Sequence, residues 1–389
     1  MVNNTIKKTY LLKDRPKSVG RKLIVLIDGT WNDENGEDNS GVVTNVVKLY
    51  RVLEGDSENQ IARYFRGVGN DDDFGFIEKT INGATGGGEK KIRQQAYSAI
   101  AKEYREGDKI LIFGFSRGAA GARMLASDLN EKGIPEEITI TYKISANKQS
   151  NAVENRFESY TSSGKVAVDV AFLGVWDTVG AFGIPMKLFG IPFNKFNLFR
   201  DMHVASNVKK AVHLICADDT RNPFVPTLMN YKPGVVHEVW FPGVHSDVGG
   251  GYKRDQLGWT TLMYMIDQLN EHLAASAISP LKYNDEILSC YQQLKDQTDE
   301  YYFHFHGLGY KKSIREIHVL ENDKPSKHKA LIHQSVFDLE KSKCTYNVVV
   351  KKRWFRSDKE SIFRIQYNPA NVKSLDGHYV VDKGWIKGD

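Results

Sequence analysis

The sequence contains few cysteines and no long apolar run. Its 389 residues include three cysteines, which lie far apart and form no CxxC pair, so a disulfide framework and a cysteine zinc site are not expected. No apolar stretch approaches the ~18 residues that a membrane-spanning helix needs. The segment Met1–Lys17 is polar and basic and lacks the apolar core of a Sec signal peptide. These absences predict a protein that is cytoplasmic, or one that is exported without a Sec signal peptide.

A strong excess of one charge is also absent. The chain has 53 lysines and arginines and 48 aspartates and glutamates, which leaves a formal net charge of +5. This balance excludes a polycation of the histone type and an acidic disordered chain, and we expect no nucleic-acid partner. The hydrophobic fraction of 41% is that of an ordinary globular protein. The length fits two or three domains, or one large α/β domain with insertions.

Apolar runs alternate with helical patterns from residue 21 onwards. The run Arg21–Asp28 is almost continuously apolar, as in strands that are buried on both faces of a parallel sheet. The following segment Thr44–Leu53 has helical spacing, with Thr44 or Asn45 as its N-cap. Further strands and helices are expected at Gln60–Val68, Glu89–Glu106, Asp108–Phe113, Ala119–Leu129, Val166–Val175, Ala211–Ala217 and Val235–Phe241. This alternation predicts an α/β fold with a doubly wound, mostly parallel sheet.

The pattern changes near residue 275. Beyond it, β-like segments stand between polar loops, at Tyr301–His306, Tyr346–Lys352 and Glu360–Gln366. We therefore expect a polar N-terminal tail (1–20), a catalytic domain (21–275), and a smaller C-terminal α+β extension or cap (276–389) that packs on the catalytic domain.

The pattern G-x-S-x-G at Gly114–Gly118 carries the strongest chemical signal. It stands between an apolar run and a helical segment of small residues, as in a nucleophile elbow, where a sharp turn exposes the serine at the end of a strand. The glycines on both sides of Ser116 permit the sharp turn and a close approach of helix and strand. Ser116 is thus the candidate nucleophile, and the competing interpretation is a tight turn with an inert serine.

A serine nucleophile needs a base, and the base needs an acid that orients it. In α/β-hydrolases the chain order is serine, acid, histidine. Asp177 and His245 fit this order, because each follows an apolar strand and lies in a loop of small residues. Asp218, Asp219 and Asp247 compete with Asp177 as the acid, and His203, His213, His237 and His333 compete less strongly with His245.

Oxyanion donors and substrate contacts are expected around the same strand ends. The backbone N–H of Arg117, directly after the nucleophile, is one expected donor, and that of Gly29 or Thr30 is the second. Phe115, Trp31 and Trp176 are the expected aromatic contacts to the substrate.

Two alternatives to a serine enzyme stay open. Asp28, His245 and Asp247 would suit a hard metal ion in a metal-assisted hydrolase, although no H-E-x-x-H or EF-hand pattern exists. The other alternative is a binding protein that retains the fold without turnover. The serine interpretation requires no cofactor and no metal.

The segment Lys351–Arg356 interleaves basic and aromatic residues. Such a segment is compatible with contact to anionic lipid headgroups or to nucleic-acid phosphate, and also with a lysine-protected edge strand, which is the favoured interpretation. A peripheral membrane contact therefore stays open.

Several blocks, taken together and in order, resemble one known family. They are IDGTWN (27–32), RGVG (66–69), GFSRGA (114–119), GVWDTVG (174–180), ADDTRNPF (217–224), FPGVHSDVGGGY (241–252), IHQSV (332–336) and YNPAN (367–371). They are similar to the α/β-hydrolase domain of the type VI secretion phospholipase effectors. The resemblance implies a serine lipase or esterase that acts on lipid esters, most of all phospholipids, with Ser116, Asp177 and His245 as its triad. It also implies a lipid or ester substrate, and a secretion apparatus or an immunity protein as partner.

Overall fold

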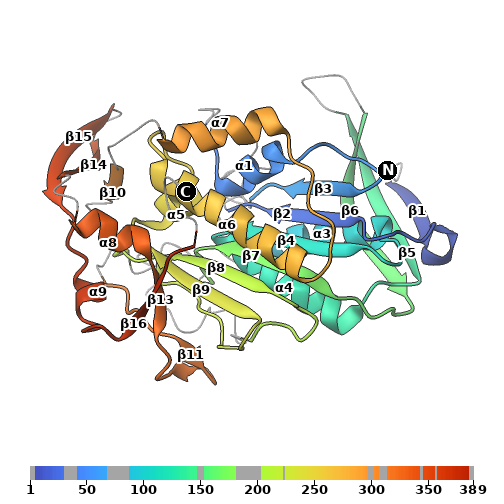
Figure 1. Ribbon diagram of the computed structural model, residues 1–389. Helices are drawn as coiled ribbons and strands as arrows, with labels where there is room; N and C mark the ends of the chain where they lie inside the picture. The colour runs from blue at the N-terminus through green and yellow to red at the C-terminus, as the bar shows by residue number, and fades with distance from the viewer. Residues whose placement is uncertain are drawn as a thin grey trace, which may run out of the picture.

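The structure is a computed structural model, and it describes residues 5–29, 42–67, 87–146, 153–180, 203–221, 224–296, 302–305, 313–341, 345–354 and 357–384. Its centre is an eight-stranded sheet with the strand order β16-β13-β9-β8-β7-β4-β2-β3, in which every neighbouring pair is parallel (Figure 1). The strands are β2 (Lys22–Ile27), β3 (Gln60–Phe65), β4 (Lys109–Phe115), β7 (Val170–Trp176), β8 (Ala211–Cys216), β9 (Val236–Phe241), β13 (Ala330–His333) and β16 (Tyr379–Asp382). The predicted doubly wound parallel α/β fold is confirmed.

Helices cover both faces of this sheet. They are α1 (Asn45–Val52), α3 (Gly87–Glu103), α4 (Arg117–Lys132), α5 (His245–Gly249), α6 (Gln256–Ala275), α7 (Asp285–Asp296), α8 (Gln334–Lys341) and α9 (Ala370–Lys373). The predicted cap of α1 is present, because Thr44 Oγ accepts a hydrogen bond from the backbone N–H of Val47.

The strand β2 shows why the sheet is buried on both faces. Ile24 and Leu26 lie in a core with apolar residues of α1 and α6, whereas Leu23 and Val25 lie in a second core with residues of α3 and α4. Because successive side chains of a strand point to opposite faces, a continuously apolar strand is required between two helical layers.

Two smaller sheets lie at opposite ends of the molecule (Figure 1). One contains β1 (Thr5–Leu11), β5 (Glu137–Ala146) and β6 (Val153–Ser163), and the other contains β10 (Tyr302–Phe305), β14 (Thr345–Trp354) and β15 (Ser357–Gln366). Short elements complete the described chain: η1 (Leu12–Asp14), β11 (Leu320–Glu321) and β12 (Lys324–Pro325). The last strands predicted from the sequence correspond to β10, β14 and β15.

The N-terminal segment differs from the predicted polar tail. Residues Thr5–Leu11 form a strand that pairs antiparallel with β5, and Thr9 is opposite Thr139. The side chains of this strand are mostly exposed. Its polar pattern therefore resembles that of a tail, and its partner strand is too distant in the sequence to be inferred locally.

The expected boundary near residue 275 does not separate the main sheet from the rest. The strands β13 and β16 follow that boundary and extend the sheet beyond β9. A third apolar core joins Ile215 and Trp240 of the earlier strands to Ile332 and Val336 of the later chain. The C-terminal segment thus shares both sheet and core with the catalytic unit.

Candidate active site

The serine of the G-x-S-x-G pattern lies in a strained turn between β4 and α4. Ser116 has φ 58° and ψ −121°, and its backbone N–H donates to the carbonyl of Trp176 on the neighbouring strand. A Cβ on Gly114 would lie 2.5 Å from the carbonyl oxygen of Gly118, and a Cβ on Gly118 would lie 2.3 Å from the carbonyl oxygens of Ile27 and Asp28. Both glycines are therefore required by close backbone approaches, as the nucleophile-elbow interpretation predicted.

Replacing Gly118 with alanine should disturb the site by forcing α4 away from β2. We expect a loss of about 1–3 kcal/mol in the free energy of unfolding, together with reduced ester hydrolysis. Gly121→Ala is the matched control in the same helix, because a Cβ there meets no atom nearer than 3.5 Å. Denaturant unfolding of the two variants tests this, and equal stability of both would contradict the proposed close approach.

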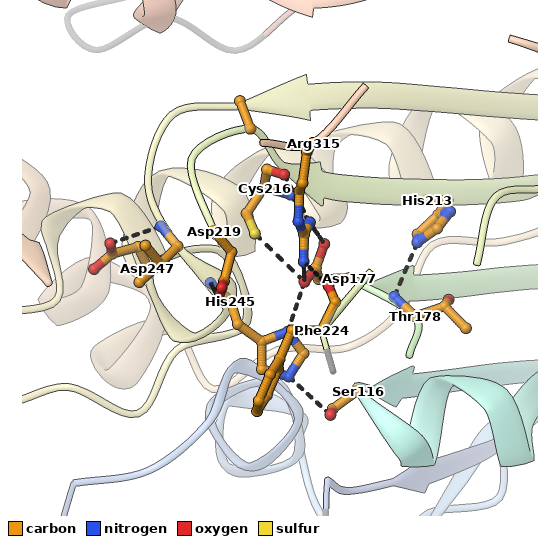
Figure 2. Close-up of polar contacts among 12 residues, drawn as sticks. Ser116, Asp177, Thr178, His213, Cys216, Asp219, Phe224, His245, Asp247 and Arg315 are labelled. Atoms are coloured by element: carbon orange, nitrogen blue, oxygen red, sulfur yellow. Dashed lines mark hydrogen bonds and ion pairs between the residues drawn. The ribbon is translucent and has the colours of Figure 1, made fainter. Parts of the chain in front are cut away.

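The structure brings Ser116, His245 and Asp177 together, although they follow three different strands (Figure 2). The Nε2 atom of His245 is 2.8 Å from Ser116 Oγ, and its Nδ1 atom is 2.6 Å from Asp177 Oδ2. An ionised carboxylate only accepts hydrogen bonds, so Nδ1 donates to Asp177 and Nε2 is left to accept from the serine hydroxyl. This is the arrangement of an activated serine.

His245 is enclosed by aromatic rings. The ring centroids of Phe115 and Phe224 lie 4.6 and 5.0 Å from that of the imidazole, and His245 is only 4% exposed. Gly249 permits this packing, because a Cβ there would lie 1.9 Å from the Phe115 ring. Burial lowers the pKa of His245 below its usual value, although the hydrogen bond to Asp177 acts in the opposite direction. The base is therefore unprotonated near neutral pH.

Asp177 is fully buried, and its carboxylate has several hydrogen-bond partners, among them the thiol of Cys216 at 3.4 Å. Besides His245, its carboxylate accepts from the backbone N–H of Cys216 and from both terminal nitrogens of Arg315, at 2.6 and 2.9 Å. Burial alone would raise the pKa of Asp177, but the charge of Arg315 and the hydrogen bonds from His245 and Arg315 outweigh it and hold that pKa below its usual range. Asp177 is therefore ionised at every pH at which His245 is unprotonated.

Arg315 was not anticipated from the sequence. It lies in a segment without regular secondary structure, between Ile314 and Glu316, and follows no apolar strand pattern. Its role depends on contacts with residues about 100 or more positions earlier in the chain, such as Asp177 and the carbonyl of Cys216. No local pattern carries such a signal.

A second interaction holds the turn that carries Asp177. The backbone N–H of Thr178 donates to Nε2 of the buried His213 (Figure 2). The Nδ1 atom of His213 is 2.7 Å from Glu238 Oε1. His213 was a weaker candidate for the base in the sequence analysis, and in the structure it accepts a hydrogen bond that holds the turn at Asp177. The turn at Asp177, which has φ 36°, is therefore fixed from two sides.

The competing acids have other partners. Asp219 forms an ion pair with Arg221 and accepts from the backbone N–H of His245, at 3.2 Å. Asp218 accepts from the backbone N–H of Gly243, and Asp247 accepts from that of Val244. None of these hydrogen bonds involves the imidazole ring, so the geometry favours Asp177 as its orienting acid.

The expected oxyanion donors lie at two strand ends. The N–H of Arg117 is the first amide of α4, directly after the candidate nucleophile. The N–H of Gly29 donates to Asp28 Oδ1 at 2.7 Å, so this amide is engaged by a carboxylate in the present conformation. Thr30 lies outside the described residues.

Among the expected aromatic contacts that the structure describes, Phe115 is the one that lies against the imidazole. Trp176 is fully buried in the core, with its ring centroid 6.4 Å from that of Phe113. We assign Trp176 to packing instead of substrate contact, because a strand between two helical layers directs its side chains into the cores. Trp31 lies outside the described residues.

The side chains of the metal alternative have separate partners. The carboxylate of Asp28 accepts from Thr44 and Tyr64, while Asp247 caps the start of α5 and points away from His245 (Figure 2). Within the described part of the chain, no three His, Cys, Asp or Glu side chains are grouped so that they could hold a metal ion. The geometry therefore gives no support to metal-assisted hydrolysis at these residues.

The parallel sheet, the elbow after β4, the acid after β7 and the histidine after β9 are features of the α/β-hydrolase fold. The family model described as "T6SS, Phospholipase effector Tle1-like, catalytic domain" matches residues 21–268. The chain therefore belongs to the Tle1-like phospholipase effector family of type VI secretion.

Individual relatives are more distant. An uncharacterized protein of Saccharomyces cerevisiae is 28% identical over 237 residues, which are 53% of this chain and 32% of that protein. The chain thus spans about a third of the length of that curated relative.

Solved structures also match. An uncharacterized protein from Pseudomonas aeruginosa has a TM-score of 0.43 and 20% identity, and the match covers 72% of this chain and 50% of that one. The Tle1 effector bound to the VgrG spike of the type 6 secretion system has a TM-score of 0.40 and 20% identity, over 61% and 52% of the two chains. An esterase of Thermogutta terrifontis with bound butyrate has a TM-score of 0.32 and 12% identity, over 70% and 90%.

Proposed function

We propose that this protein is a serine esterase that cleaves carboxylic ester bonds of lipids, with phospholipids as the principal substrates. The observation that carries the proposal is the continuous hydrogen-bonded chain from Ser116 through His245 to Asp177, over 2.8 and 2.6 Å. The family description supports the substrate class, since it is that of a phospholipase effector.

The chemistry follows from the tautomer of His245. Ser116 Oγ attacks the ester carbonyl and transfers its proton to Nε2, while Asp177 holds the proton on Nδ1 and stabilises the imidazolium. The tetrahedral intermediate collapses as His245 returns the proton to the departing alcohol, which leaves an acyl-serine. Water then repeats the sequence, with His245 as base, and releases the fatty acid.

The oxyanion of both intermediates needs hydrogen-bond donors. The N–H of Arg117 is one proposed donor, because it follows the nucleophile at the N-terminus of α4, where the helix dipole also favours negative charge. The second donor stays a sequence-based prediction at Thr30, and Gly29 would take this role only if its N–H left Asp28.

A membrane contact and a secretion partner are further proposals for this protein. Part of the basic and aromatic segment Lys351–Arg356 falls in β14, whose side chains are not among those described, so a membrane contact there is still a sequence-based proposal. Within the described residues, no helix combines the length and apolarity needed to cross a bilayer. A secretion-apparatus or immunity partner, and export without a Sec signal, are proposals drawn from the family.

The lipid proposal is tested by product analysis on phospholipid vesicles. We expect release of fatty acid and lysophospholipid, insensitivity to EDTA, and complete loss after treatment with a serine-directed phosphonate. Mass spectrometry should find the phosphonate on Ser116. Activity that EDTA abolishes and the phosphonate spares would instead establish a metal-dependent enzyme, and binding of vesicles without any product would establish a binding protein.

A further inference from the structure

The acid of the proposed triad lies between two partners. Figure 2 shows the Asp177 carboxylate with His245 on one side and the Arg315 guanidinium on the other. The side chains of Asp177 and Arg315 are 0% and 2% exposed, so water screens their attraction very little. The two oxygens of Asp177 each accept one guanidinium N–H, which fixes the plane of the carboxylate as well as its position.

Arg315 also ties together other parts of the site. One terminal nitrogen donates to the carbonyl of Cys216 at the end of β8, and the other donates to the carbonyl of Phe224. Phe224 is the residue whose ring lies against His245. A single buried side chain thus contacts the acid, the strand end beside it and an aromatic wall of the base.

The position of Arg315 is itself built by the C-terminal segment. The side-chain amide of Asn371 donates to the carbonyl of Arg315, at 3.3 Å, and to that of Ala217 after β8, at 2.8 Å. Both Arg315 and Asn371 lie beyond residue 268, where the match to the catalytic-domain family ends. The segment that follows the family match therefore reaches the centre of the site.

We propose that Arg315 is a positioning residue that holds the Asp177 carboxylate toward His245 and, through its charge, keeps the imidazole unprotonated to a lower pH. This inference rests on the proposed serine mechanism. It extends the working site to a part of the chain outside the matched family domain.

The reason is the net charge of the buried group. With His245 neutral, Asp177 and Arg315 cancel, and protonation of His245 would leave one uncompensated positive charge in a buried site. Without Arg315 the same group would carry a net negative charge, and protonation of His245 would remove it. Because burial penalises net charge, loss of Arg315 should favour the imidazolium.

The other charged groups around His245 do not reverse the sign of this charge effect. Asp219 and Arg221 form an ion pair whose charges cancel. Burial raises the pKa of the Cys216 thiol, which leaves it neutral, and burial raises the pKa of Asp218 to about 7. A further acid, Asp247, accepts from the backbone N–H of Val244 at the start of α5.

The test compares the pH dependence of kcat/KM in wild type, Arg315→Met and Arg315→Lys on a soluble ester. In Arg315→Met the acid limb should move to higher pH by at least about one unit. Arg315→Lys retains the charge but not the two-pronged contact, so its acid limb should stay near that of wild type while kcat falls by up to about 100-fold. If the acid limb of the pH profile stays unchanged in both variants, Arg315 has only a structural role and the proposal is wrong.

Arg21→Met is the matched control. Arg21 forms a comparable buried, two-pronged pair with Asp108, at 3.0 and 2.6 Å, at the opposite ends of the strands. It should lose stability as Arg315→Met does and keep the wild-type acid limb. A shift of the same size in Arg21→Met would show that general loosening, and not the charge of Arg315, moves the limb.

A measurement on wild type keeps the inference testable if Arg315→Met does not fold. Nuclear magnetic resonance of ¹⁵N-histidine-labelled protein should show His245 titrating below the ordinary histidine value of about 6.5. Titration above that value would overturn the proposal. This readout requires no turnover, so it separates the inference from the mechanism: full activity of Ser116→Ala would refute the mechanism, whereas the position of the His245 titration decides the charge effect.

Discussion

Ser116→Ala should lower kcat for ester hydrolysis by at least about 10⁴-fold on both soluble esters and phospholipid vesicles. The reason is that no other hydroxyl is hydrogen-bonded to Nε2 of His245 among the described residues. Residual hydrolysis would come from water activated by His245 and from the oxyanion donors, which the substitution leaves in place. Initial rates of purified protein, free of host esterase, provide the measurement.

Stability separates loss of chemistry from loss of fold in this experiment. The positive φ at position 116 strains alanine as much as serine. The free energy of unfolding of Ser116→Ala should therefore stay within about 0.5 kcal/mol of wild type. Ser116→Gly should be equally inactive and more stable by about 1 kcal/mol, because glycine adopts this backbone conformation without strain. Ser127→Ala in the same helix should keep full activity. Wild-type rates in Ser116→Ala would refute the nucleophile assignment.

Asp177→Asn should have two large effects at once. It removes the group that holds the correct tautomer of His245, for which a loss of about 10⁴-fold in kcat is expected. It also leaves Arg315 buried without a counter-charge, which should cost about 3–5 kcal/mol of stability. Denaturant unfolding and initial rates at a temperature where the variant is still folded measure the two effects separately.

Asp108→Asn is the control for the second effect. It removes the acid of the Arg21 pair, which is as deeply buried but lies at the other ends of the strands. We expect a similar loss of stability with nearly full activity in the folded fraction. If Asp108→Asn loses stability and Asp177→Asn does not, Arg315 has another counter-charge when Asp177 is neutral. The charge argument for Arg315 would then be wrong.

The sheet and the three central side chains were predictable from the sequence because each has a local signature. A strand buried on both faces is a continuous apolar run, and Ser116, Asp177 and His245 each follow such a run into a loop of small residues. The carboxyl ends of parallel strands meet at one edge of the sheet, so three loops of this kind are expected to converge on a single site.

Features that depend on distant pairing were not predictable. The strands β13 and β16 have four residues each, and only pairing with β9 and with each other places them in the main sheet. Nothing in the sequence distinguishes Arg315 from the other arginines, because its role depends on the contact with Asp177 that only the fold creates. Trp176 was expected to contact the substrate because it ends a strand, but its side chain lies in the core and is fully buried. The hydrogen bond from the Gly29 N–H to its neighbour Asp28 was not anticipated from the sequence either.

The contact between Asp177 and a late segment of the chain has a consequence for biosynthesis. A ribosome makes Ser116, Asp177 and His245 well before Arg315, so a growing chain can hold all three without the arginine that sets their charge and alignment. Strands β13 and β16, which complete one edge of the sheet, also emerge late. An enzyme assembled in this order gains its full hydrolytic power only once residue 315 has left the exit tunnel. Because the proposed substrates are lipid esters, unfinished copies would then be poor lipases.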